Sequence, residues 1–529
     1  MGQFPTRGGN SGKQILLSDQ QGFDRRWFAP SLQAVYVPTR AEEVADCVAD
    51  ALLNYDKDVK VTSGRHCYEN FVYNDSTRAV IDMSSINQVG FDSARNAYFI
   101  DAGCENWTVY RTLLNSHGKT LPAGSCYSVG AGGHITGGGY GLLSRMHGLT
   151  IDHLTGVDLV TWDASSKQAT LRHVSNDSPS QPERDLFWAL TGAGGGNFGV
   201  IVRYFFKQLP DAPDYATLFT LAWDWSEITP ELFAALLEIY AGLMPQLPEN
   251  EFTLLKLTHV AAKQLGMTLQ VASLPGMSYD SHCQHASSRA QTVKQHFEQV
   301  LPAVHLRRPL GGHPGYMSST SSSLTEQHLT YLEAVQTLNG SGPNQFGKYK
   351  SAYMKKGFPA DQIKTIFDYL HLTPNGLDMS QCLLQVDSYG GAINRVSPTA
   401  TAVPQRSSIM KLQYQAYWNN AAEPGQAGKS PYREMAQAYL EWINKFYAEV
   451  YAAMGGTPDP LKDASGTVDG CYYNYCDSVL GTHEDGRIDQ AMWLYFLNNF
   501  RNNTRNLVGI KRHWDPLNYF HGPQSIPLQ

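Results

Sequence analysis

Ser63-Gly-Arg-His-Cys-Tyr-Glu69 sets our first expectation about the fold, because it follows an apolar, β-branched run at residues 59–62 and reaches His66 through a glycine turn. A second stretch of this kind, Pro122-Ala-Gly-Ser-Cys126, ends at Cys126, 60 residues further on (126 − 66 = 60). Glycine accepts unusual dihedral angles and carries no side chain, so such turns let the backbone approach a bound group closely. Their N–H groups also bind pyrophosphate. The two stretches predict a ligand seated across loops at strand ends.

The side chains that end these stretches have the chemistry for covalent attachment to a flavin. A histidine nitrogen can attack the activated 8α-methyl group of an isoalloxazine, and a cysteine thiolate can add at its C6. Both reactions need the side chain to be held against the ring, which the glycine turns allow. A single histidine or cysteine usually has no such role, but the two in these settings predict FAD attached through His66 and Cys126.

Composition limits the possible classes of protein. The 529 residues are too many for one compact core, which favours two domains or one large discontinuous domain. A net charge of −7 without a basic run argues against partners such as nucleic acid or an anionic membrane. No stretch has the apolar core of a signal peptide or the ~18 apolar residues of a membrane span. The eight scattered cysteines resemble neither a disulfide framework nor a metal site, so we expect a cytoplasmic protein.

The pattern of apolar residues changes near residue 206. Before it, β-branched runs alternate with helical stretches, and we expect strands at 34–38, 59–62, 79–82, 97–101, 154–161, 169–174 and 200–206 and helices at 40–55, 107–116 and 185–190. After it, the pattern is typical of an antiparallel sheet backed by helices. There we expect strands at 217–223, 252–260, 265–272, 379–387 and 409–418 and helices at 230–243, 287–300 and 431–454. The fold class is therefore α+β.

Two further segments are rich in glycine. Residues 130–141 contain seven glycines and would bring the main chain against the flavin. Residues 192–199 lie between a predicted helix and the following strand, which is the reverse of the order in a dinucleotide-binding phosphate turn. A purely structural turn is an equally good interpretation of this second segment.

Asp469-Gly-Cys-Tyr-Tyr-Asn-Tyr-Cys-Asp477 concentrates three tyrosines in nine residues. A tyrosine that faces a flavin can remove a hydroxyl proton while hydride leaves the same carbon. This requires neighbours that acidify the phenol, since its ordinary pKa is about 10. Aromatic packing alone is the alternative. The end of the chain, at residues 514–520 and 524–527, is also too distinctive for a frayed tail.

Together these segments resemble the berberine bridge enzyme-like branch of the vanillyl-alcohol oxidase superfamily, over nearly the whole chain from Val35 to Pro527. The resemblance implies that His66 forms the 8α-histidyl bond and Cys126 the 6-S-cysteinyl bond to FAD. The family's Tyr-x-Asn-Tyr-x-Asp pattern falls at residues 472–477, and its terminal Asp-Pro-x-Asn-x-Phe pattern at residues 515–520. The chain looks most similar to bacterial members that oxidise sugars attached to antibiotics.

This resemblance implies a discontinuous FAD-binding domain, residues 1–206 and 468–529, around a substrate-binding domain, residues 207–467. It implies Tyr472 as the catalytic base, with Tyr140 assisting or serving a second step, and a small residue, Val129, that admits O2 beside the flavin. One departure is Arg65, where the family usually has glycine. The residues implied to line the cofactor site, besides the two anchors, are Ser63, Gly64, Arg65, Val129, Gly130, Gly133, His134, Gly138, Gly196, Asn197, Val200, Asn474 and Tyr475.

Three functions remain open on the sequence alone. The first is an oxidase of a hydroxyl group on a sugar or a glycosylated or hydroxylated secondary metabolite, which passes electrons to O2 and releases H2O2. The second is oxidative C–N or C–C chemistry on an amine or alkaloid-like metabolite, which needs a carboxylate base that the sequence does not locate. The third is a non-enzymatic flavoprotein that only binds a compound. For the substrate wall we name Gln385, Tyr389, Trp418 and Asn419, which lie on or beside predicted strands.

Overall fold

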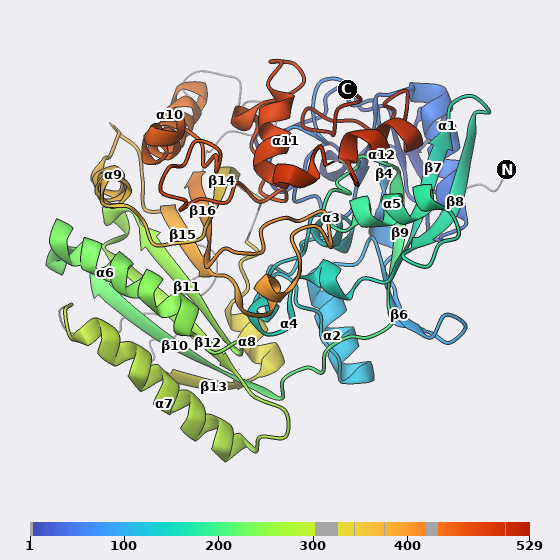
Figure 1. The fold of residues 1–529 in the computed structure, drawn as a ribbon. Helices are drawn as coiled ribbons and strands as arrows, with labels where there is room; N and C mark the ends of the chain where they lie inside the picture. Colours follow the sequence, from blue (N-terminus) through green and yellow to red (C-terminus); the bar gives the residue numbers. More distant parts are fainter. Residues whose placement is uncertain (1–3, 302–325, 343, 375, 419–431, 503) are drawn as a thin grey trace.

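The computed structural model describes residues 4–301, 326–342, 344–374, 376–418, 432–502 and 504–529 (Figure 1). Within these residues the strands form three sheets. The first contains a parallel core, with order β1-β2-β4-β3, and its strands are β1 (Thr6–Gly8), β2 (Ala34–Tyr36), β4 (Ala79–Asp82) and β3 (Val59–Thr62). The second is antiparallel, with order β5-β6-β9-β7-β8, and its strands are β5 (Val89–Asp92), β6 (Ala97–Asp101), β9 (Val200–Phe206), β7 (Gly156–Asp163) and β8 (Gln168–Ser175).

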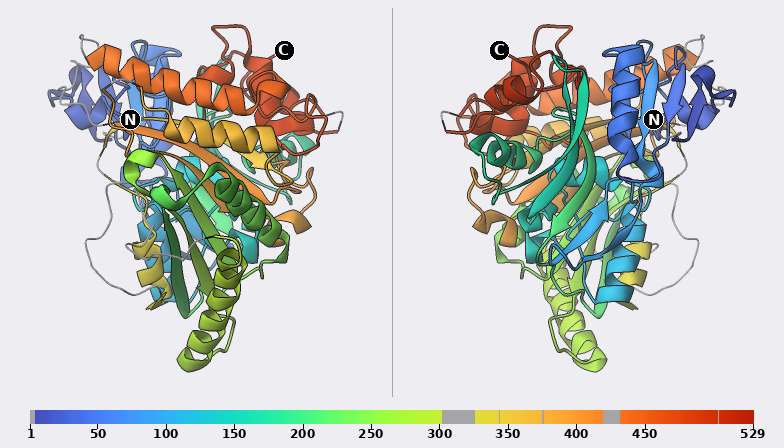
Figure 2. Two further views of the ribbon diagram at one scale, coloured as in Figure 1. Left: turned by 90° about the vertical axis from the view of Figure 1, so that its left-hand side faces the viewer. Right: turned by 90° about the vertical axis from the view of Figure 1, so that its right-hand side faces the viewer.

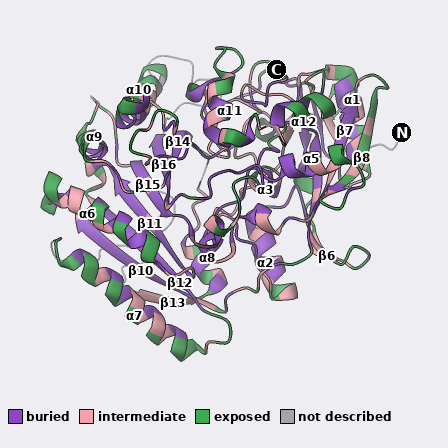
Figure 3. Ribbon diagram, viewed as in Figure 1, coloured by how far each residue is buried: buried purple, intermediate pink, exposed green. Residues whose placement is uncertain are grey.

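The third sheet is the largest and is antiparallel throughout. Its order is β13-β10-β12-β11-β15-β16-β14, and its strands are β13 (Glu326–Thr330), β10 (Tyr215–Asp224), β12 (Gln264–Ala272), β11 (Glu251–Thr258), β15 (Cys382–Ser388), β16 (Met410–Trp418) and β14 (Phe346–Met354). Every residue of β14 and β16 is buried, because both faces of the sheet are covered (Figure 3).

Helices cover one face of the third sheet and the first two hundred residues cover the other. The outer layer is formed by α6 (Pro230–Leu243), α7 (Tyr279–Glu298), α9 (Ala360–His371) and α10 (Tyr432–Val450), as Figures 1 and 2 show from two directions. On the inner face, the hydroxyl of Tyr140 donates to the carbonyl of Ser388, and Arg145 donates to the carbonyl of Tyr389. A short helix, α8 (Tyr331–Thr337), packs on β10 and β13.

The remaining helices belong to the N- and C-terminal parts of the chain: α1 (Glu43–Tyr55), α2 (Asn106–His117), α3 (Ala131–Thr136), α4 (Ser144–His147), α5 (Gln181–Leu190), α11 (Ile488–Phe496) and α12 (Leu507–Trp514). The C-terminal segment returns to the first two hundred residues, beside the blue strands in Figure 1. There the ammonium of Lys511 donates to the carbonyl of Asn197, and Lys60 donates to the carbonyl of His521. Residues far apart in the sequence therefore enclose one region.

The predicted α+β class is confirmed, and each expected strand and helix has a counterpart. The helix expected at 287–300 begins earlier, at Tyr279, because Ser278 caps it by accepting from the N–H of Ser281. The apolar pattern does not predict β14, since two lysines interrupt its apolar residues. No helix among the described residues is long and apolar enough to cross a membrane. The domain boundaries remain a prediction.

Candidate active site

An elongated cavity of about 370 Å³ lies between the N-terminal part of the chain and the C-terminal segment, within the size range of cofactor sites. The turn after β3 supplies His66, and the loop before α3 supplies Cys126. The predicted residues that line this cavity are Ser63, Gly64, Arg65, His66, Cys126, Val129, Gly130, Gly133, His134, Tyr140, Gly196, Val200, Tyr472, Asn474 and Tyr475. Segments named from separate motifs thus meet at one site.

Two predicted cofactor residues, Asn197 and Gly138, are not part of the lining of this cavity. Asn197 is fully buried, and its amide donates to the hydroxyl of Tyr473 at 2.9 Å while its carbonyl oxygen accepts from the N–H of Ile526. A Cβ at Gly138 would meet Val403 and Tyr472. Neither residue is part of the cavity lining, so both act here as supports rather than as direct contacts.

The glycines of the two turns pack directly against each other. A Cβ at Gly64 would lie 2.1 Å from the backbone nitrogen of Gly130, and a Cβ at Gly130 would lie 2.2 Å from that of Gly64. By contrast, a Cβ at Gly133 or Gly196 would meet nothing within 4 Å, although both line the cavity. The backbone is therefore bare where a bound group would lie against it, which fits the FAD that the sequence predicts.

Arg65 adopts a left-handed conformation, with φ of 62°. This explains why glycine suits the position, since other side chains are strained there. The guanidinium offsets that cost by pairing with Asp82 at 2.5 Å and donating to the carbonyl of Ser18. Arg65, in place of the usual glycine, therefore still allows the turn that leads to His66.

The two predicted anchors have different electrostatic surroundings. Burial lowers the pKa of His66 to about 4, so its imidazole is neutral at pH 7. Its Nε2 lies 2.8 Å from the hydroxyl of Ser128, and its ring stacks on Phe23 at 4.5 Å. Burial raises the pKa of the Cys126 thiol, opposed by the N–H of Gly340 and the ammonium of Lys256. The neutral imidazole is the form that attacks the flavin, whereas Cys126 must first lose its proton, which burial opposes and the Gly340 N–H and Lys256 favour.

A second cavity of about 160 Å³ opens on the inner face of the third sheet. It shares His66, Tyr68, Gly124, Cys126, Val129, Tyr140 and Tyr475 with the first cavity. Its floor carries a row formed across three strands, in which Lys256 is opposite Gln385 and Gln385 is opposite Gln413. Gln415 and Asp387 add further polar groups, and aromatic side chains form the walls. Amides, a carboxylate and an ammonium beside aromatic faces suit a polar ring with several hydroxyl groups.

Of the three predicted substrate residues that the structure describes, Gln385 alone is in this lining. Tyr389 is fully buried, and its hydroxyl donates to the carbonyl of Gln405. Trp418 is stacked on Tyr439 at 5.1 Å. Both are core residues that line neither cavity, so the expectation that they form the substrate wall is corrected. A position on or beside a strand does not decide which way a side chain points, and these two side chains pack in the core. Asn419 lies outside the described residues.

The sequence did not indicate a buried group of charges at the junction of the two cavities. The ammonium of Lys411 donates to the hydroxyl of Tyr475 at 3.0 Å and pairs with Asp387 at 3.4 Å. It also lies 4.6 Å from the ring centroid of Tyr140 and 5.2 Å from that of Tyr472. A charged residue within an otherwise apolar strand, as in Cys382-Leu-Leu-Gln-Val-Asp387, is the signal that would have located these residues.

Burial dominates the pKa values of this group. It lowers the pKa of Lys411 to about 8 and raises that of Asp387. It also raises the pKa of Tyr475 well above its usual value, while the ammonium at 3.0 Å favours the phenolate. Burial raises the pKa of Tyr472 to about 12, and Asn474 donates to its hydroxyl at 3.0 Å. The expected acidification of Tyr472 is therefore not what its surroundings produce.

Comparison with known proteins identifies the family. The family model described as "FAD binding domain" matches residues 32–169, and that described as "Berberine and berberine like" matches residues 471–527. Hexose oxidase of Chondrus crispus is 38% identical, covering 97% of this chain and 93% of that protein. Aclacinomycin-N/aclacinomycin-A oxidase of Streptomyces galilaeus is 32% identical, covering 96% of this chain and 87% of that protein.

Solved structures agree over the whole chain. Aclacinomycin oxidoreductase superposes with a TM-score of 0.82 at 29% identity, and a glycopeptide hexose oxidase complexed with teicoplanin superposes with 0.82 at 27% identity. Each comparison covers 99% of both chains. The two glycine turns, the tyrosine segment and the matched models lead to one conclusion: this chain belongs to the berberine bridge enzyme-like family and is an FAD-dependent oxidoreductase.

Proposed function

We propose that this protein oxidises a hydroxyl group of a sugar or of a glycosylated metabolite, with FAD attached through both His66 and Cys126 and with O2 as the electron acceptor. The observation that carries the proposal is the position of the two anchors, each at the end of its own glycine turn and both at the junction of the two cavities. The similarity to a hexose oxidase and to an oxidase of aclacinomycin supports the substrate class.

The chain's own residues would bind the substrate and take its proton. The FAD that His66 and Cys126 would hold would supply the acceptor for hydride from the substrate carbon and for the transfer of two electrons to O2 to give H2O2. Gln385, Gln413 and Lys256 would hydrogen-bond the ring hydroxyl groups from the floor of the smaller cavity. Val129 lines both cavities, where its size would govern the access of O2.

Tyr475 is a second candidate for the base beside Tyr472, although burial raises the pKa of both phenols. Its ring lines both cavities, whereas Tyr472 lines only the larger one. The ammonium of Lys411 would stabilise the Tyr475 phenolate, which then accepts the hydroxyl proton as hydride leaves. Tyr140 has its hydroxyl committed to the carbonyl of Ser388, so we assign it to holding the Lys411 ammonium with its ring.

A second candidate function is supported by one observation. Asp387 is a buried carboxylate in the smaller cavity, which is the kind of base that oxidative C–N or C–C chemistry on an amine requires. Lys411 at 3.4 Å and the amide of Gln385 at 2.9 Å already occupy its oxygens. An incoming amine would have to displace one of them, so we place alcohol oxidation first.

Acid precipitation of the purified protein tests the attachment. With two bonds, His66→Ala and Cys126→Ser each keep flavin in the pellet, and only the double variant releases it. Cys283→Ser is the matched control, because its thiol lines neither cavity. Release of flavin from the wild type would overturn the attachment.

Peroxide release measured against free sugars, glycosides and amines tests the reaction. Sugars that bleach the flavin and release H2O2 in air support the first function. Bleaching by amines alone would transfer the assignment to the second.

A further inference from the structure

Two cysteines that the proposed reaction does not use face the cofactor cavity. Cys67 follows His66 directly and Cys476 follows Tyr475 directly, and both line the larger cavity as free thiols. The side chains of the two cysteines interact with each other, although 409 residues separate them in the sequence (476 − 67 = 409). Among the described residues, Cys126 is the other thiol in this lining.

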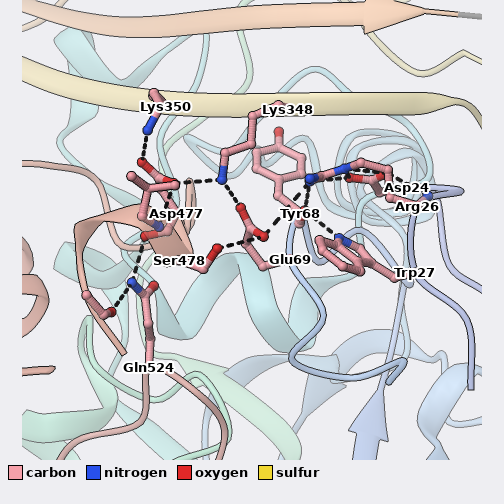
Figure 4. Close-up of polar contacts among 12 residues, drawn as sticks. Asp24, Arg26, Trp27, Tyr68, Glu69, Lys348, Lys350, Asp477, Ser478 and Gln524 are labelled. Carbon is pink, nitrogen blue, oxygen red and sulfur yellow. Dashed lines mark hydrogen bonds and ion pairs between the residues drawn. The ribbon is translucent and has the colours of Figure 1, made fainter. Parts of the chain in front are cut away.

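A buried network of charges holds the two cysteine-bearing segments side by side, independently of the thiols (Figure 4). The ammonium of Lys348 lies between Glu69 and Asp477, and it donates to Asp477 at 2.6 Å. Lys350 donates to the other oxygen of Asp477 at 2.6 Å, and the hydroxyl of Ser478 donates to Glu69 at 3.2 Å. The side chains of both lysines, Glu69 and Asp477 are at most 2% exposed. Glu69 is two residues after Cys67 and Asp477 is one after Cys476, so the network holds together the two segments that carry the thiols.

A third segment anchors the Cys67 side of this pair. The guanidinium of Arg26 and the indole N–H of Trp27 each donate to the carbonyl of Tyr68 at 3.0 Å (Figure 4). Arg26 is itself held by Asp24 at 2.9 Å. The backbone directly after Cys67 is therefore held at the carbonyl of Tyr68.

The two thiols are chemically unequal. The neighbouring thiol of Cys476 and the N–H groups of Glu69 and Phe71 hold the pKa of Cys67 below its usual value, against burial. The proximity of Cys67 raises the pKa of Cys476 well above its usual value, with burial acting in the same direction. Cys67 is thus the better nucleophile, and Cys476 is a protonated partner in position to react with it.

We propose that Cys67 and Cys476 are a redox-active dithiol, which a peroxide closes to a disulfide. The Cys67 thiolate attacks the O–O bond of H2O2, forming a sulfenic acid and, with one proton, releasing water. The thiol of Cys476 then attacks that sulfur, forming the S–S bond as a second water leaves. Two thiols lose two electrons and two protons, and one peroxide becomes two waters. Peroxide from any source suffices, so the inference stands apart from the proposed substrate.

Closure would tie the segment of the histidine anchor to the tyrosine segment. The bond would join the two walls of the cofactor cavity that carry His66 and Tyr475. Disulfide formation would also consume the sulfenic acid of Cys67, which excess peroxide would otherwise oxidise irreversibly to sulfinic acid. The pair would therefore protect the cavity wall beside the site where peroxide is expected to form.

Peptide mapping of the flavin-loaded protein tests the proposal without an activity assay. After H2O2 treatment and alkylation in denaturant, we expect a peptide that links Cys67 to Cys476, a loss of two alkylatable thiols, and recovery of both with dithiothreitol. Cys104→Ser, a buried thiol outside both cavities, should leave the link unchanged. Cys476→Ser should abolish the link and send Cys67 to sulfinic acid.

Two results would overturn the proposal. One is full alkylation of Cys67 and Cys476 after a peroxide treatment that oxidises Cys283, which is partly exposed. The other is a link from Cys67 to a cysteine other than Cys476. Both results are read from the wild-type protein, so they remain decisive even where a variant fails to fold.

Discussion

Replacing Lys411 by methionine should slow substrate oxidation with little effect on substrate binding. Methionine keeps the length of the side chain in a site where Lys411 is completely buried, but it removes the donor that lies 3.0 Å from the hydroxyl of Tyr475. A hydrogen bond to a charged group contributes about 1.5–3 kcal/mol. One pKa unit corresponds to about 1.4 kcal/mol, so the pKa of Tyr475 should rise by about one to two units. At fixed pH the phenolate, and with it kcat, should fall about 10- to 100-fold.

The wild-type enzyme should show the same dependence as a function of pH. Burial lowers the pKa of Lys411 to about 8, so its ammonium is present below that pH and is lost as the pH rises through it. The rate of flavin bleaching by substrate, measured anaerobically by stopped flow, should therefore decline above about pH 8. In Lys411→Arg the charge persists and the decline should disappear.

Retention of flavin and of the circular dichroism spectrum would show that the Lys411→Met variant is folded. If this variant bleaches its flavin at the wild-type rate and with the wild-type pH profile, Lys411 has no part in activating Tyr475. A rise in KM without a fall in kcat would also refute the reasoning, since it would place Lys411 in substrate binding.

Three other substitutions test separate parts of the site. Val129→Leu should slow the reoxidation of reduced flavin by O2 about tenfold, or 1.4 kcal/mol of barrier, without changing the reductive half-reaction, as stopped-flow traces would show. Gly133→Leu should lose most of its flavin while the apoprotein unfolds at an unchanged temperature, because a Cβ there enters open cavity. Asp477→Asn should lower the free energy of unfolding by roughly 3–5 kcal/mol at pH 7, because it removes the carboxylate that pairs with buried Lys350 and one of the two that pair with buried Lys348. Lys348 and Lys350 hold the pKa of Asp477 below the ordinary 3.8, so this difference is complete above that pH and should shrink as the pH falls, measured by urea titration.

The sequence predicted most elements, and the glycine turns that carry His66 and Cys126 into the cavity lining, because their signals are local. A glycine turn after a β-branched run can be recognised from a few consecutive residues. His66 and Cys126 each lie at the end of such a turn. Gly64 and Gly130 show why these turns need glycine: the two turns pack so closely that a Cβ at either position would collide with the backbone of the other turn. The α+β class followed from the change of apolar pattern near residue 206, which the three sheets confirm.

The substrate side could not be predicted in the same way, because its contacts join distant strands. Lys411 meets Asp387 only through the pairing of β15 with β16, and it meets Tyr475 across 64 residues of sequence. Trp418 has the same apolar neighbours as a pocket residue would have, but it packs into the core. Which face of a strand points to a cavity depends on what covers that face, and here the cover comes from the first two hundred residues.

Two buried carboxylates on the same side of the protein show how structural and functional charges differ. Asp477 receives two ammonium groups at 2.6 Å each, and its pKa falls despite complete burial. Asp387 receives one ammonium at 3.4 Å and one amide, and burial raises its pKa. The first charge is fully compensated and lies outside the cavity linings, whereas the second is incompletely compensated and lines the smaller cavity. Perturbed ionisable groups gather where chemistry occurs, so incomplete compensation at Asp387 and Lys411 is itself an argument that substrate completes this site.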